Sequence, residues 1–184
     1  VLLVMKQTSY MNSRDLGFQN KDILIVPNNS GVIRQNQEVY KTELLRSPHI
    51  LGVSLGTDAL GFGDTNNSKY LVPEGKPKSE GAITTFFTVG MDFIDLHEIQ
   101  VVKGRQFNPE LSTDSLSIIV NEAFVRAMGL ENALEEKVKI WGEDSDPRSI
   151  IGVVKDFNFQ SLHSKVAPAL MMANQRNNTF WSIK

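Results

Sequence analysis

Short apolar runs and one amphipathic stretch alternate along the first third of the chain. Residues 21–27 form an apolar run that ends at a proline, and residues 50–55 form a second run. Between them, apolar residues recur at helical spacing from residue 33 to 46, and Pro48 follows. This part of the sequence therefore predicts a strand, a helix and a second strand.

The rest of the chain combines a loop-rich stretch with further strands and one well-marked helix. Glycine, proline and polar residues dominate residues 56–81, where we expect loops and a short strand at 70–72. Asn121 stands at a helix-cap position before residues 122–128, and Gly129 follows them. Further apolar runs predict strands at 82–89, 99–103, 116–120, 137–141, 149–154 and 169–173, and a helical turn at 92–97. The pattern indicates an α+β fold.

Composition removes several classes of function. The 184 residues are 41% hydrophobic and 22% charged, as in globular domains that bury a core. Lysine and arginine number 19 against 21 acidic residues, so the net charge of -2 supplies no overall field for nucleic acid. The absence of cysteine excludes disulfides, thiol nucleophiles and cysteine-ligated metals.

The two ends of the sequence resemble cut ends. The chain begins at Val1 rather than at methionine, and it contains neither a signal-peptide layout nor the roughly 20 apolar residues of a membrane span. Residues 179–184 read as the opening of a strand, with nothing after them to pair with it. We therefore expect this chain to be a segment of a longer protein.

A glycine-rich stretch invites a comparison with phosphate-binding loops. Gly56, Gly61 and Gly63 lack the spacing of a dinucleotide fingerprint, and no Gly-Lys-Ser/Thr element accompanies them. We interpret the stretch as a turn or a mobile loop.

Residues 92–98 gather carboxylates and an imidazole, as a metal site would. On a helix, however, His97 lies five residues from Asp92 and two from Asp95, and neither spacing places both groups on one face. We favour Asp92 as a helix cap and the apolar residues between as packing, and we predict no metal ligands, cofactor-binding residues or catalytic residues in the chain. The adjacent Phe86 and Phe87 are likewise expected in the core.

The pair Lys155 and Asp156 follows the apolar run 150–154, and His163 comes seven residues later. Asp156 fits a general base, or else a cap that accepts backbone N–H groups for the following turn. Side chains alternate across a strand, so Lys155 and Asp156 are expected to point apart, with Lys155 on the face of Val153 and Phe157. We therefore favour the cap, and no Gly-x-Ser-x-Gly elbow supports a hydrolase.

Five motifs and a proline occur in a recognisable order. They are DLGF at 15–18, KGRQF at 103–107, IVNEA at 119–123, GL at 129–130 and IGVVKDFNFQSLH at 151–163, followed by Pro168. The ordered set resembles the extracytoplasmic domain of MacB/FtsX-type ABC transporter permeases, most closely those of bacteria of the Bacteroides kind.

That resemblance implies a two-lobed α+β fold like the MacB periplasmic core. A strand-helix-strand, porter-like lobe would comprise residues 1–57 and 168–184, and a mixed α/β lobe would be inserted at 58–167. The family's porter lobe continues with another strand, helix and strand, so this one would be incomplete.

The resemblance also implies a non-catalytic, periplasmic segment of an inner membrane protein, without cofactors. It would couple cytoplasmic ATP hydrolysis to export, lipoprotein release or activation of a partner outside the membrane. The implied partners are a cytoplasmic ATPase reached through membrane helices, a second permease in a homodimer or heterodimer, and an envelope adaptor protein, but no nucleic acid.

Two other hypotheses stay open from the sequence. The first is a ligand-binding or sensing module of the cell envelope that uses the loop-rich residues 56–81. The second is a hydrolase that uses Asp156 and His163.

Overall fold

The computed structural model describes residues 16–19, 21–57, 60, 67–143, 146–160, 165–173 and 179–184. The strands are β1 (Leu24–Pro27), β2 (Val53–Gly56), β3 (Ser68–Pro73), β4 (Ala82–Val89), β5 (Val101–Gly104), β6 (Ser117–Asn121), β7 (Lys137–Ile140), β8 (Arg148–Val154), β9 (Ala169–Ala173) and β10 (Phe180–Ile183). The α-helices are α2 (Gly31–Gln35), α3 (Gln37–Leu45), α4 (Phe93–Leu96) and α5 (Glu122–Ala127), and 3-10 helices cover Lys78–Glu80, Ser112–Leu116 and Ala133–Glu135. The predicted α+β class is confirmed.

Six of the described strands close into a small barrel. They follow the order β4, β3, β7, β8, β6 and β9, and parallel pairing of β9 with β4 closes the ring. Each strand contributes apolar side chains to one buried cluster, which includes Leu71, Phe86, Ile118, Val138, Ile150 and Leu170. A cluster that draws on all six strands must lie inside the ring, and Phe124 of α5 joins it.

A second core lies on the outer face of the barrel. Phe86 belongs to the interior cluster and its neighbour Phe87 to the outer one, as alternation along β4 requires. The ring of Phe87 lies 6.1 Å from that of Phe157 and 5.1 Å from that of Phe159. Both predicted core phenylalanines of β4 are confirmed, and the two faces of one strand serve two cores.

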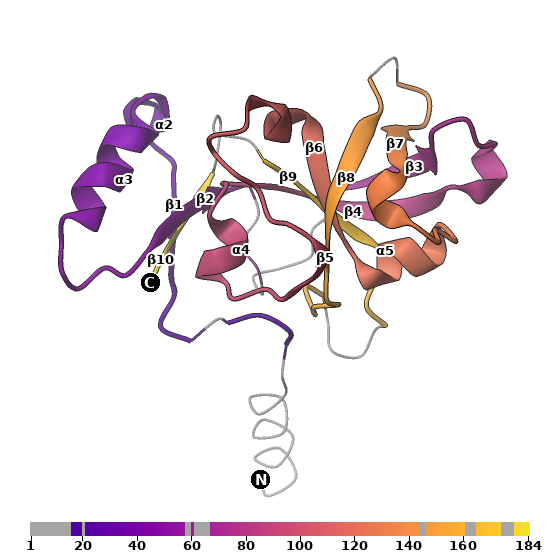
Figure 1. Ribbon diagram of the computed structural model, residues 1–184. Coiled ribbons are helices and arrows are strands. Elements are labelled where there is room, and N and C mark those ends of the chain that lie inside the picture. The colour runs from indigo at the N-terminus through magenta and orange to yellow at the C-terminus, as the bar shows by residue number, and fades with distance from the viewer. Residues whose placement is uncertain are drawn as a thin grey trace, which may run out of the picture.

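Beside the barrel, β1, β10 and β2 form a three-stranded antiparallel extension of the sheet. The strand expected at 179–184 is present as β10, which lies between β1 and β2 and pairs with both, so its partners come from earlier in the chain. Its Trp181 packs with Val53 and Leu55 of β2 beneath Ile33 and Leu44 of the two helices. Figure 1 shows α2 and α3 at one end of the molecule, α5 at the other, and α4 between them.

The single helix predicted at 33–46 is two helices. Asn36 has φ −119° and ψ 26°, outside the helical range, and its side-chain amide donates to the carbonyl of Val32 at 2.9 Å. Asparagine competes for backbone groups in this way, which ends one helix and begins the next.

The join between the extension and the barrel is narrow. Strands β2 and β4 pair through one residue pair, Gly56 and Val89. Strand β9 pairs in the barrel with β4 and β6, and β10 pairs with β1 and β2 in the extension. Among the described residues, no helix is long and apolar enough to cross a membrane.

Candidate functional site

The carboxylate of Asp156 holds the start of α5. Its Oδ1 accepts the backbone N–H of Ala123 at 2.7 Å, and its Oδ2 pairs with the guanidinium of Arg126. The pKa of Arg126 is raised by that hydrogen bond. Asp156 therefore accepts a backbone N–H group as predicted. The element that it caps is different, because it is the helix α5, whose Ala123 lies 33 residues earlier, rather than the turn that follows Asp156. His163 lies outside the described residues.

Strand alternation fails at the end of β8. Val154 and Phe157 belong to the outer cluster, whereas Val153 lies inside the barrel, so the expectation that Val153 and Phe157 share a face is wrong. The pairing of β6 with β8 shifts register between Ile118 and Ile119, and β8 ends at Val154. A register shift and a strand end both break a period of two.

Asn121 joins three elements at one point. Its Oδ1 accepts the backbone N–H of Phe124 and that of Ala169, both at 2.9 Å, and its amide donates to the carbonyl of Ala167 at 3.0 Å. The predicted cap of α5 is therefore confirmed, and the same side chain also fixes the entry to β9.

Residues of four of the five motifs meet around β8 and the residues that follow it. Gly17 has φ +80°, and a Cβ there would lie 2.7 Å from the carbonyl oxygen of Asp156. Gly104 has φ +72°, and a Cβ there would lie 2.3 Å from the carbonyl oxygen of Ile151. Both positions need glycine for conformation and for space. In these two motifs the glycine is therefore required by close backbone packing. Asp15 of the first motif lies outside the described residues.

The residues considered for a metal site, His97 and the nearby carboxylates, each contact a different partner and do not converge on one point. His97 is buried between the rings of Phe18 and Phe93, and its Nδ1 and Nε2 lie 3.3 Å from the Gln19 carbonyl oxygen and from the Ser182 hydroxyl. Burial lowers the pKa of His97 to about 4, outweighing the opposing hydrogen bond to Gln19. His97 is therefore a neutral group that fastens β10 to the end of α4.

The carboxylates near His97 each have a different partner. Asp92 pairs with Lys41, Asp95 accepts the side-chain amide of Gln106 at 2.9 Å, and Glu98 pairs with Lys184. Within the described ranges, no group of three His, Cys, Asp or Glu residues is placed to hold a metal ion. Gly61 and Gly63, considered above as a phosphate loop, lie outside those ranges.

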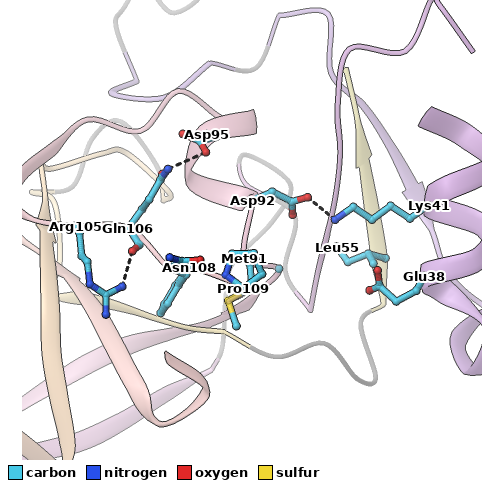
Figure 2. Close-up of a pocket in the computed structure, with 12 residues that line it drawn as sticks. Glu38, Lys41, Leu55, Met91, Asp92, Asp95, Arg105, Gln106, Asn108 and Pro109 are labelled. Carbon is cyan, nitrogen blue, oxygen red and sulfur yellow. Dashed lines mark hydrogen bonds and ion pairs between the residues drawn. The ribbon is translucent and has the colours of Figure 1, made fainter. Parts of the chain in front are cut away.

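A groove of about 610 Å³ lies between α3 and the segment that runs from Gly90 to Pro109. Its charged and polar lining comprises Glu38, Lys41, Asp92, Asp95, Arg105, Gln106 and Asn108. Figure 2 shows Lys41 reaching across from α3 to Asp92, while Gln106 reaches Asp95 from the opposite wall. The groove was not predictable from the sequence, because its residues come from separate segments and no pattern in the chain shows that α3 lies beside residues 90–109.

One wall of the groove is held by a buried ion pair. Asp114 is fully buried, and it accepts both terminal nitrogens of Arg105, at 2.6 and 2.8 Å, as well as the backbone N–H of Asn108 at 2.8 Å. The hydrogen bond from Arg105 lowers the pKa of Asp114 despite burial, and it raises the pKa of Arg105. This bidentate geometry fixes residues 105–114 as one loop.

The fold of this chain, a closed six-stranded barrel joined to a three-stranded sheet with two helices, is similar to the solved outer domains of MacB-like ABC transporter permeases. The sequence matches no known family model and no curated protein. Solved structures share the fold, three of which are described below, and this confirms at the level of structure the resemblance seen in the motifs.

The periplasmic region of MacB from Actinobacillus actinomycetemcomitans matches with a TM-score of 0.61 and 16% identity, over 91% of this chain and 76% of that chain. The extracellular domain of the noncanonic ABC-type transporter YknZ from Gram-positive bacteria matches with a TM-score of 0.55 and 13% identity, over 89% and 83%. A domain assigned to a permease protein from Porphyromonas gingivalis matches with a TM-score of 0.50 and 13% identity, over 71% and 58%. These sources are diverse, so the fold does not support the expected Bacteroides-like origin.

Proposed function

We propose that this chain is the non-catalytic, extracytoplasmic domain of an ABC transporter permease. The observation that carries the proposal is the shared fold, which extends over 91% of the chain in the match to the MacB periplasmic region. The ordered motifs support it independently, because residues of four of them pack together around β8 and its end in that fold. In this proposal the segment lies outside the inner membrane.

The domain would pass movement that is driven by cytoplasmic ATP hydrolysis to a process outside the membrane, such as export, lipoprotein release or activation of a partner. Transmission of this kind needs two bodies whose relative placement can change. We assign β1, α2, α3, β2 and β10 to one lobe and the barrel to the other, which moves the expected boundary from residue 168 to a point between β9 and β10. The one-pair join of β2 to β4 supports this division.

The partners follow from the same proposal. They are a cytoplasmic ATPase subunit or domain reached through membrane helices, a second permease in a homodimer or heterodimer, and an envelope adaptor protein.

Location is tested on the native full-length protein in intact cells and in spheroplasts. Protease added to spheroplasts should cleave within these 184 residues, and protease added to inside-out vesicles should not. Cleavage only in the vesicles would overturn the proposal.

Coupling is tested with two engineered cysteines, since the chain has none of its own. Spin labels at Glu43→Cys on α3 and Glu131→Cys beyond α5 report the distance between the proposed lobes in the membrane-reconstituted transporter. Two labels within the barrel, at Lys69→Cys and Glu131→Cys, are the matched control. The first distance should change between the ATP-bound and nucleotide-free states while the second stays constant, and an unchanged first distance in an actively transporting sample would refute coupling through these lobes.

The groove favours the ligand-binding hypothesis as a second candidate, because its volume lies within the range of known ligand sites. It differs from the site expected in the loop-rich residues 56–81. The hydrolase hypothesis gains no comparable support, since both oxygens of Asp156 are engaged by α5.

A further inference from the structure

A second pocket, of about 190 Å³, opens at one end of the six-stranded barrel. Its apolar walls come from five of the barrel strands and include Leu71, Phe86, Ile118, Ile140, Leu170 and Met172. Helix α5 begins at Glu122, directly after β6, and its Phe124 enters the interior cluster from the opposite end. The pocket is therefore a mouth of the barrel, and barrel mouths are a common place for small-molecule sites.

Two cationic side chains stand at the rim of this mouth. Lys69 precedes Leu71 by two residues in β3, so alternation directs both side chains to the inner face. Arg148 lies directly opposite Val138 across β8 and β7, so it also shares the face of an interior residue. Both cations line the pocket. The apolar walls thus end at two positive charges.

Arg148 is the cation that is available to a ligand. Lys69 is paired with Glu143 at 2.8 Å. Within the described part of the chain, Arg148 forms no ion pair, and one terminal nitrogen of its guanidinium donates to the carbonyl of Ser115 at 3.2 Å. Asp146 also lines the rim, but its side chain is exposed and forms no ion pair with a described residue. A guanidinium with unused donors at the edge of an apolar pocket matches a carboxylate, which it binds through two parallel hydrogen bonds.

The volume of the pocket sets the size of the apolar part of the ligand. A cavity of about 150 Å³ lined by leucine, isoleucine and phenylalanine binds benzene, which has six carbon atoms. In proportion, the volume here accommodates about eight carbon atoms. Further in, the barrel is filled by other buried side chains of the interior cluster, among them Val120, Phe124 and Ile150.

We propose that the mouth of the barrel binds an apolar carboxylate of about eight carbon atoms, with its chain in the pocket and its carboxylate on Arg148. The site is separate from the groove, because the two linings share no residue. This proposal concerns the barrel and does not depend on a transporter function.

The test uses the 15N-labelled 184-residue chain and NMR titration with octanoate. Saturable shifts at the amides of Ile118, Ile140 and Met172 are expected, with a Kd on the order of 1 mM or below. 1-Octanol and octylamine should bind at least about tenfold more weakly, since neither offers a carboxylate to the guanidinium. Equal or tighter binding of either one would overturn the anionic ligand, and the absence of saturable shifts up to about 10 mM octanoate would overturn the site.

Chain length separates a closed pocket from a non-specific apolar surface. On an open surface each added methylene should tighten binding by about fourfold. In the barrel, affinity should rise from hexanoate to octanoate and rise no further with dodecanoate, because buried side chains fill the interior beyond the pocket. A continuous rise through dodecanoate would overturn the pocket as the binding site.

Two variants locate the carboxylate and the chain of the ligand. Arg148→Met removes the charge and keeps an unbranched side chain, so it should weaken octanoate at least about tenfold more than it changes 1-octanol. Arg46→Met, at an exposed position just beyond α3, is the matched control and should change neither affinity. Ile140→Trp, at the half-buried end of β7, should block both ligands. If Ile140→Trp does not fold, Arg148→Met decides, and an unchanged octanoate affinity in that folded variant would refute the assignment.

Discussion

Replacing Arg105 by methionine should destabilise the domain in a pH-dependent manner. The change removes the guanidinium from Asp114 while keeping an unbranched side chain of similar reach. Asp114 has no exposed side-chain surface, and after the change only the backbone N–H of Asn108 would donate to its carboxylate. The variant therefore leaves a buried negative charge without its counterion.

The expected cost follows from the burial of the two partners. Removing one partner of a buried ion pair costs about 3–5 kcal/mol. The side chain of Arg105 is 44% exposed, so water can approach the vacated position and screen the remaining charge. We therefore expect a loss of about 2 kcal/mol in the free energy of unfolding at pH 7.

The pH dependence separates this mechanism from a loss of packing. In the native protein the pKa of Asp114 is lowered, chiefly by Arg105, so its stabilising contribution is present above the unfolded-state pKa of about 3.9 and is lost as pH falls through the native value. Without Arg105, burial raises the pKa of this carboxyl, and its charged form opposes folding at neutral pH. The difference between wild type and variant should therefore be largest near pH 7 and shrink toward pH 4.

Urea unfolding followed by tryptophan fluorescence at pH 7, 5.5 and 4 measures the difference. Arg46→Met is the matched control, because its pair with Glu43 is exposed on both sides and should contribute less than about 1 kcal/mol. Adding Asp114→Asn to Arg105→Met should remove the pH dependence. An equal loss at pH 4 and pH 7, or a loss no greater than that of Arg46→Met, would refute the reasoning.

Three further predictions concern stability and are checked by chemical denaturation. Asn121→Ala should cost about 2 kcal/mol, since it removes the cap of α5 and the bond to β9, whereas Ser30→Ala, which removes one 3.4 Å cap bond at α2, should cost less than half as much. His97 has a native pKa below its unfolded value, so stability should fall as pH drops from about 6.5 toward about 4, and His97→Gln should flatten that slope. Gly152→Ala should cost about 2 kcal/mol or more because its Cβ would lie 2.2 Å from a backbone carbonyl oxygen, and a change no larger than that of Gly31→Ala would contradict this.

The local signals in the sequence located most elements, and some of their contacts, correctly. Strands β4 and β9 have the bounds that their apolar runs predict, and the cap, body and end of α5 follow from Asn121 and Gly129. These features depend on residues that are neighbours in the chain, where propensity and capping act directly. The capping role of Asp156 was also predictable, although the helix that it caps was not.

Long-range pairing was beyond the sequence patterns. Nothing in the apolar runs of β4 and β9 indicates that they pair in parallel and close a ring. The alternation of apolar and polar residues indicates which face of a strand is buried, but it does not indicate the partner strand. The same holds for β10, whose partners lie more than 120 residues earlier in the chain. The groove was hidden for a related reason: Lys41 and Asp92 are 51 residues apart, and each is an ordinary charged residue in its local context.

The position of β10 explains why the groove exists. Because β10 lies between β1 and β2, strand β2 is the one that meets β4, and the backbone N–H of Gly90 then donates to the carbonyl of Leu55 at 2.6 Å. That contact sets the floor of the groove, and Lys41 of the overlying helix reaches the start of α4. The end of α4 holds β10 in turn, through His97 and Ser182. One short helix thus contacts the three-stranded sheet and its overlying helix at both of its ends, so a change in the placement of this sheet would change the shape of the groove.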